Sequence, residues 1–166
     1  TGRYLAPLLA ERGDEVHAIA HVAPDAAVPG IAAVHVADLT DPRRLAEVVE
    51  AADPDQVVHL AAIAFVAHGE VEEMYRTNVV GTRNLLDVLS RRHKRPSAVV
   101  VASSANIYGN ARGGVLDESV PPAPANDYGV SKVAAELVAS LYRGKLPVTV
   151  ARPFNYTGVG QSPSFL

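Results

Sequence analysis

The chain lacks cysteine altogether, has no long hydrophobic run and carries no large excess of charge of one sign. The absence of cysteine excludes disulfide bonds and thiolate nucleophiles, and it fits a reducing compartment. No apolar stretch is long enough to span a bilayer, and the N-terminus shows no basic segment followed by an apolar signal core. We therefore expect a cytoplasmic protein without a membrane partner.

The formal net charge of -3 comes with scattered Lys and Arg, so no basic stripe marks a nucleic-acid interface. The single basic run, 91–95, follows a helical pattern and is predicted to be a solvated helix end whose charge complements the helix dipole. The six histidines show no spacing that suits a metal site, and no metal is expected.

Short apolar runs of β-forming residues alternate with amphipathic stretches along the chain. The order strand, helix, strand predicts a parallel sheet. The runs are apolar at nearly every position, which is typical of strands covered by helices on both faces. We therefore predict one domain over residues 1–166, an α/β fold with a doubly wound parallel sheet, and strands at 16–20, 34–37, 57–61, 98–102 and 148–151.

Apolar residues at helical spacing predict three helices, over residues 5–13, 71–89 and 127–142. Pro7 is expected to kink the first helix unless it falls in the first turn. Gly81 lies inside the second helix, which implies that another segment packs closely against it. Residues 108–125 are rich in glycine and proline and are expected to form a long surface loop, a common form of binding loop.

Tyr128 and Lys132 are one helical turn apart, so their side chains converge on one face of the third predicted helix. A free tyrosine titrates near pH ~10, and a neighbouring ammonium lowers that pKa towards neutrality, which makes the hydroxyl a useful proton donor. Ser103 and Ser104 end an apolar strand and would supply a hydroxyl that holds a carbonyl oxygen. These residue types predict carbonyl or alcohol redox chemistry.

Ligands of a doubly wound sheet bind at the carboxyl ends of its strands. Asp38 and the segments 61–62, 103–104 and 152–155 all fall at such ends, so they are predicted to line one crevice. The two alanines at 61–62 would let a flat or phosphate-bearing cofactor approach the backbone closely. Asp38 is a candidate acceptor for an adenine amino group.

The motifs in their order resemble the extended short-chain dehydrogenase/reductases, and within them the NAD(P)-dependent epimerase/dehydratase family, which has a Rossmann-like fold and acts on nucleotide-activated sugars. They are Thr1-Gly2-Arg3, Asp38-Leu39, His59-Leu60-Ala61-Ala62, Asn78-Val79-Val80-Gly81-Thr82, Ser103-Ser104, Tyr108-Gly109 and Tyr128 with Lys132. Residues 151–162 are similar to the GDP-4-dehydro-6-deoxy-mannose reductases, relatives of GDP-mannose 4,6-dehydratase. That group usually has His and Pro where this chain has Tyr156 and Val159.

The resemblance implies a role for each matching residue. Tyr128 is the catalytic acid and base, Lys132 its electrostatic partner and a ligand of the cofactor ribose, and Ser104 the hydroxyl that orients the carbonyl. Asn78 has two open interpretations: it stabilises a helix bend, or it supports the cofactor site through a local hydrogen bond. The residues expected to bind the cofactor are Gly2, His21, Asp38, Leu39, Leu60, Ala61, Ala62, Asn78, Tyr128, Lys132 and Arg152; those expected to bind the substrate are Ser104, Asn106, Tyr128 and Asn155.

The implied reaction is the reduction of a GDP-4-keto-6-deoxyhexose at C4 by NAD(P)H. Dehydratases of this family place an acid and a base just after the active serine or threonine, where this chain has Ala105 and Asn106. A 4,6-dehydratase is therefore disfavoured, unless Asp117 and Glu118 substitute from the loop. A nucleotide-sugar 4-epimerase and a non-catalytic dinucleotide-binding protein remain as alternatives.

The choice between NAD and NADP depends on the residue that follows the strand at 16–20. An acidic residue there normally selects NAD by binding the ribose 2′-hydroxyl. His21 stands in this position and can tolerate or bind a 2′-phosphate, which tilts the prediction towards NADP.

Thr1-Gly2 resembles the end of a Gly-x-x-Gly-x-x-Gly loop. The resemblance thus implies that the first strand, most of the phosphate-binding loop and the C-terminal substrate-binding region lie outside this chain. It also implies a homodimer, in which the helices that contain Asn78 and Tyr128 pair across the interface as a four-helix bundle.

Overall fold

The structure, a computed structural model, describes residues 1–64, 71–110 and 114–155. Within these ranges no helix has the length and apolar character that crossing a membrane requires. The strands are β1 (His17–Ala20), β2 (Ala33–Val36), β3 (Gln56–His59), β4 (Ala98–Ala102) and β5 (Val148–Ala151). The helices are α1 (Gly2–Glu11), α2 (Pro42–Ala52), α3 (Val71–Tyr75), the π-helix η1 (Arg76–Gly81), α4 (Thr82–Arg91), the 3₁₀-helix η2 (Ala105–Tyr108) and α5 (Asp127–Ser140). The five predicted strands are confirmed, with small shifts at their ends.

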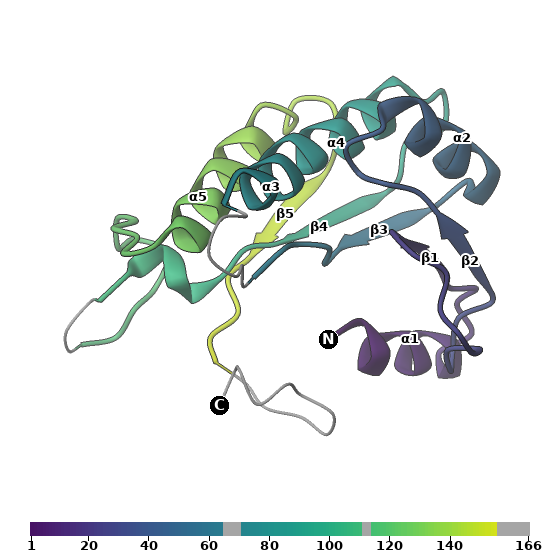
Figure 1. Cartoon of the computed structure of the whole chain (residues 1–166), viewed down its shortest axis with the longest axis horizontal. Coiled ribbons are helices and arrows are strands. Elements are labelled where there is room, and N and C mark those ends of the chain that lie inside the picture. The colour runs from purple at the N-terminus through teal and green to yellow at the C-terminus, as the bar shows by residue number, and fades with distance from the viewer. Residues whose placement is uncertain (65–70, 111–113, 156–166) are drawn as a thin grey trace.

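All strand pairs are parallel, and they form two groups, β1–β2 and β3–β4–β5. Figure 1 shows helices α2 to α5 on one side of the strands and α1 on the other. Helices on two sides of parallel strands make the α/β, doubly wound architecture that the sequence predicts. They also explain why the strands are apolar at consecutive positions.

The main core lies between β4 and the helices that cover it. Val99 and Val101 are fully buried and pack against Leu45 of α2 and Leu86 of α4. Burying a side chain of this size stabilises the fold by about 1.5–3 kcal/mol. Ser103 is also buried and follows Val101 by two residues, so it continues the side of β4 that faces the helices.

The helix predicted over 71–89 consists of three successive segments, α3, η1 and α4. The whole predicted range is thus helical, but the chain takes a wider π-helical turn around Asn78, a feature that is common at functional sites. The Thr82 hydroxyl donates a hydrogen bond to the Asn78 carbonyl oxygen at 2.7 Å. The close packing expected at Gly81 is confirmed, since a Cβ there would lie 2.8 Å from the Leu39 Cβ.

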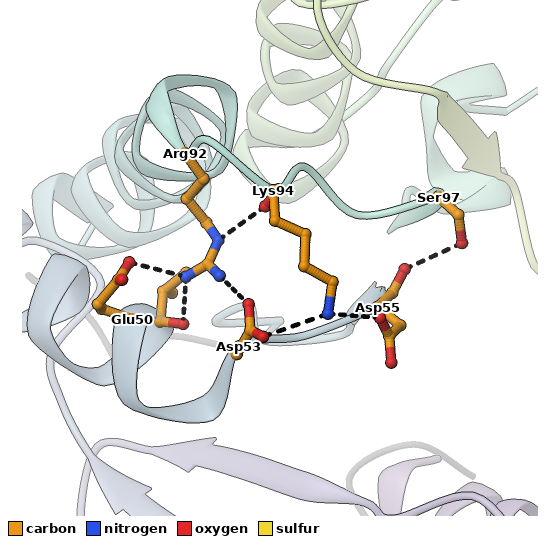
Figure 2. A network of polar contacts seen from close by, with 7 residues as sticks. Glu50, Asp53, Asp55, Arg92, Lys94 and Ser97 are labelled. Carbon is orange, nitrogen blue, oxygen red and sulfur yellow. Dashed lines mark hydrogen bonds and ion pairs between the residues drawn. The ribbon is translucent and has the colours of Figure 1, made fainter.

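The basic run 91–95 joins the end of α4 to the end of α2 (Figure 2). Arg92 donates a hydrogen bond from Nη1 to the Val49 carbonyl oxygen at 2.7 Å, and it forms ion pairs with Glu50 and Asp53. Its charge therefore complements the C-terminal end of α2 rather than that of its own helix. The side chain is 8% exposed, so the expectation of a solvated cluster is wrong for Arg92.

Candidate active site

Ser104 follows β4 directly and caps η2. Its Oγ accepts hydrogen bonds from the Asn106 backbone N–H at 3.2 Å and from Asn106 Nδ2 at 3.1 Å. These bonds occupy the lone pairs of the oxygen, so the O–H hydrogen is left to donate to another acceptor. A carbonyl oxygen placed against Ser104 would meet a donor whose orientation is already set.

The helix α5 presents Tyr128 and Lys132 one turn apart near its N-terminal end. Asn126 caps this end by accepting, through Oδ1, the backbone N–H three residues further on at 2.8 Å. Asp127 accepts a hydrogen bond from the Tyr75 hydroxyl at 3.0 Å, which ties α3 to the start of α5. The first turn of α5 is thus held from both sides.

Gly129 is the point where α5 meets η2. A Cβ on Gly129 would lie 2.7 Å from the Asn106 carbonyl oxygen and 3.0 Å from the Pro124 Cβ. Only a residue without a side chain permits this approach. The helix that carries Tyr128 therefore lies directly against the segment that begins with Ser104.

Lys132 is 5% exposed although it carries a charged group. Burial lowers the pKa of its ammonium to about 8, while the nearby Glu136 carboxylate opposes that shift. No residue in the described ranges accepts a hydrogen bond from its Nζ or forms an ion pair with it. An ammonium in this position is available to act on the Tyr128 hydroxyl and on a ligand.

Asn78 joins three parts of the site from within η1. Its Oδ1 accepts the Ile63 backbone N–H at 2.8 Å, and its Nδ2 donates to the Ile63 carbonyl at 2.9 Å and to Ser131 Oγ at 3.0 Å. Both amide hydrogens are therefore used within the protein. Asn78 thus lies in the helix bend and also holds the segment after β3 against α5 through its hydrogen bonds. Direct contact between Asn78 and a cofactor stays a prediction.

A buried histidine, His59, completes this polar layer and was not selected from the sequence as a site residue. Its Nε2 lies 2.9 Å from Thr82 Oγ1. Because the Thr82 hydroxyl donates to a carbonyl, we assign the shared hydrogen to His59 Nε2. Burial, with a smaller contribution from Lys132, lowers the pKa of His59 to about 4, so the ring is neutral at physiological pH.

The side chain of Arg152 forms hydrogen bonds with two other side chains of the protein. Its guanidinium makes two hydrogen bonds to Glu136 and one to the Tyr108 hydroxyl, at distances of 2.7–3.0 Å. Its predicted contact with a cofactor gains no support from these bonds and stays a prediction. The sequence signal that was missed is the Glu136 carboxylate, one turn after Lys132 on α5.

At the ends of β1 and β2, His21 and Asp38 face each other, with His21 Nδ1 3.8 Å from Asp38 Oδ2. The other carboxylate oxygen of Asp38 accepts hydrogen bonds from the Thr40 N–H and hydroxyl, and these lower the pKa of Asp38. Gly2, at the start of α1, lies beside Leu60, with 3.8 Å from its Cβ position to the Leu60 Cδ1.

Of the remaining predicted residues in the described ranges, Asn106 alone is joined to a site residue by hydrogen bonds, and its partner is Ser104. Leu39 packs against Gly81 in the helix layer, while Ala61 and Asn155 are exposed. Ala62 is half-buried and Asn106 is exposed beside Ser104. The positions 156 and 159, where the chain departs from the reductase pattern, lie outside the described residues.

The residues at this end of the strands fit a dinucleotide. In the described part of the chain, Ser103 Oγ is a fully buried side-chain oxygen without a hydrogen-bond partner. The ammonium of Lys132, a residue that is 5% exposed, makes no hydrogen bond or ion pair with a described residue either. Two buried groups with unused donors suit a ribose and an amide, which carry several acceptors. No group of three or more metal-ligating side chains is present in the described ranges.

A model of the NAD dependent epimerase/dehydratase family matches residues 1–165. The chain belongs to this family. A GDP-6-deoxy-D-talose 4-dehydrogenase of Aggregatibacter actinomycetemcomitans is 40% identical over 129 residues, which are 78% of this chain and 44% of that protein. A GDP-6-deoxy-D-mannose reductase of Pseudomonas aeruginosa is 36% identical over 139 residues, 80% of this chain and 45% of that protein.

A solved structure of UDP-glucose 4-epimerase from Brucella ovis, in complex with NAD, superposes on this epimerase/dehydratase chain with a TM-score of 0.80. The two are 32% identical, and the match covers 93% of this chain and 48% of the other. The chain thus spans about half the length of the relatives it matches. These findings confirm the resemblance to the family and to its GDP-6-deoxy-sugar members, and they confirm the Rossmann-like fold.

Proposed function

We propose that the protein is an NAD(P)-dependent oxidoreductase of nucleotide-activated sugars that reduces a GDP-4-keto-6-deoxyhexose at C4. The observation that carries the proposal is the contact of Gly129 on α5 with Asn106 on η2, since α5 also bears Tyr128 and Lys132 and η2 directly follows Ser104. The two GDP-6-deoxy-sugar relatives support the choice of substrate.

Each of the three side chains has a distinct part in this reaction. The Ser104 hydroxyl donates a hydrogen bond to the C4 carbonyl oxygen and stabilises the negative charge that develops there. Tyr128 gives its proton to the same oxygen, and the Lys132 ammonium stabilises the tyrosinate that remains. The nicotinamide cofactor supplies hydride to C4 when bound.

Dehydration is the less favoured reaction because Ala105 and Asn106 carry no carboxyl group after Ser104. Asp117, one of the two acidic alternatives in the loop, is exposed and accepts hydrogen bonds from the Ser119 N–H and hydroxyl. Its carboxylate is therefore engaged in a local turn.

The test is the consumption of NADPH or NADH by the full natural chain with GDP-4-keto-6-deoxymannose. We expect one cofactor oxidised for each sugar reduced. Epimerisation without net cofactor oxidation would replace the reductase with the 4-epimerase, and loss of water from GDP-mannose would indicate a dehydratase. Cofactor binding without turnover of any nucleotide sugar would indicate a non-catalytic binding protein.

We propose NADP as the preferred cofactor, because His21 is exposed beside the end of β1 and can face a 2′-phosphate. Replacing His21 with aspartate places a carboxylate there, which repels the phosphate and accepts the ribose hydroxyls of NAD. We expect H21D to shift the ratio of the two dissociation constants towards NAD by about tenfold or more, measured by fluorescence titration. An unchanged ratio would show that His21 does not read the 2′ position.

We also propose a homodimer formed through α5 and the helix that contains Asn78. In support, Val130, Leu137 and Leu141 are exposed along or just after α5, and Val80 is exposed on η1. Covering such a face is a usual reason for helices to pair between subunits. Light scattering that gives the mass of a monomer would contradict this assembly.

A further inference from the structure

Glu136 and Arg152 form a nearly buried ion pair close to Lys132. Arg152 Nε donates to Glu136 Oε1 at 3.0 Å, and Arg152 Nη2 donates to Glu136 Oε2 at 2.7 Å. The two side chains are 13% and 20% exposed, respectively. Both carboxylate oxygens are therefore engaged by a single guanidinium in a two-pronged geometry.

The position of the guanidinium is itself fixed. Arg152 Nη1 donates to the Tyr108 hydroxyl at 2.8 Å, and that hydroxyl donates to the Asp117 carbonyl oxygen at 2.9 Å. The guanidinium carbon also lies 5.4 Å from the centre of the Tyr108 ring. Arg152 is thus held on a buried aromatic side chain of η2.

Glu136 lies four residues after Lys132 on α5, at the spacing where oppositely charged side chains form ion pairs along a helix. In a site with little water such a pair would be strong. Within the described ranges, Lys132 nevertheless forms no ion pair, and Glu136 pairs with Arg152 instead.

We propose that Arg152 is a positioning residue that holds Glu136 away from Lys132 and thereby leaves the ammonium available to Tyr128 and the cofactor. The inference rests on the proposed function, which assigns those tasks to Lys132. Arg152 then serves the site through Glu136.

Among the described residues, Glu136 and His59 are the titratable groups whose electrostatic interaction with Lys132 shifts a pKa. The charge of Lys132 helps to lower the pKa of His59, on β3. Because that pKa is about 4, the His59 ring is neutral above pH ~5 and carries no charge that acts on Lys132. Tyr128, on α5, is the other titratable side chain of the site. Removal of Arg152 would leave the Glu136 carboxylate as the dominant charge near Lys132, which raises the pKa of the ammonium.

The test is the titration of the Lys132 ammonium by NMR, with [ε-13C]lysine in the full natural chain and the signal assigned by its loss in Lys132→Arg. Four forms are compared: wild type, R152Q, E136Q and the double variant. We expect R152Q to raise the Lys132 pKa by about one unit or more, because the carboxylate is uncompensated. In E136Q and in the double variant, the Lys132 pKa is expected to stay at or below the wild-type value, because the carboxylate at position 136 is gone.

Binding of NADPH gives a second readout. R152Q is expected to raise the dissociation constant of NADPH about tenfold, because Glu136 then forms an ion pair with Lys132. Adding E136Q removes that ion pair and is expected to restore the wild-type dissociation constant. Arg92→Gln is the matched control, since it removes another buried arginine ion pair and leaves Lys132 unaffected. Thermal melting shows that each variant is folded.

Two results would overturn the inference. One is an R152Q protein with an unchanged Lys132 titration and unchanged cofactor binding. The other is a double variant that binds the cofactor as weakly as R152Q, which would show that Arg152 matters only for packing. Neither readout requires turnover, so a failure of the proposed reductase activity is recognised separately, by the absence of substrate reduction in the wild type.

Discussion

Replacing Tyr128 with phenylalanine is expected to lower kcat for the reduction of a 4-keto sugar by about 10²–10⁴-fold, the usual contribution of a positioned general acid. The substitution removes one oxygen from a half-buried side chain in the first turn of α5. Lys132 stays buried on α5, and Ser104 keeps its hydrogen bonds from Asn106, in which the phenol takes no part. Cofactor binding is therefore expected to persist.

Steady-state kinetics gives kcat, and fluorescence titration gives the cofactor dissociation constant. Tyr142→Phe is the matched control, because Tyr142 is buried just after α5 and its side-chain hydroxyl makes no hydrogen bond with any described residue. The control should keep full activity. A Tyr128→Phe protein that reduces the sugar at the wild-type rate would remove Tyr128 from the chemistry and leave the proposed mechanism without its acid.

Gly129→Ala is expected to lower the free energy of unfolding by about 1–3 kcal/mol, the cost of forcing extra atoms into a packed contact. The new Cβ would overlap the Asn106 carbonyl oxygen, a backbone atom that cannot rotate away. Alanine normally favours a helix over glycine by about 0.5–1 kcal/mol, so the overlap must exceed that gain. The sign of the effect therefore reports directly on the contact between α5 and η2.

The same substitution is expected to reduce kcat, since relief of the overlap moves Tyr128 away from Ser104, and a displacement of about 1 Å can cost about 10²-fold. Chemical denaturation measures the stability, and the activity assay measures kcat. Gly144→Ala is the control, because no atom lies within 4 Å of its Cβ position. A Gly129→Ala protein that is more stable and fully active would show that the two elements do not meet.

Much of the fold follows from local sequence. The strands are apolar runs flanked by helical patterns, and β4 and β5 coincide with the predicted 98–102 and 148–151. The sequence also predicts the close contact at Gly81, because glycine destabilises a helix interior and is retained there where another segment packs closely. Tyr128 and Lys132 lie on one face of α5, as predicted, because residues four positions apart are one turn apart in a helix.

Other features depend on tertiary contacts that no local pattern reveals. The π-helical turn at η1 contains Asn78, whose side chain forms hydrogen bonds with Ile63 and Ser131, two residues that lie far from it in the sequence. Arg152 pairs with Glu136 of α5. The sequence does not distinguish an arginine that binds a protein carboxylate from one that binds a ligand phosphate, because both can follow a strand. Buried His59 is likewise indistinguishable in sequence from an exposed histidine.

The central claim is that Ser104, Tyr128 and Lys132 together direct a hydride to a sugar carbonyl. The most direct measurement uses NADPH deuterated at the nicotinamide C4 and follows the label by NMR of the product of the full natural chain. We predict deuterium on the sugar C4, in a stoichiometric amount, and a transfer that is about 10²–10⁴-fold slower with Tyr128→Phe. A product that carries no deuterium, or a cofactor that returns unchanged after turnover, would contradict the claim.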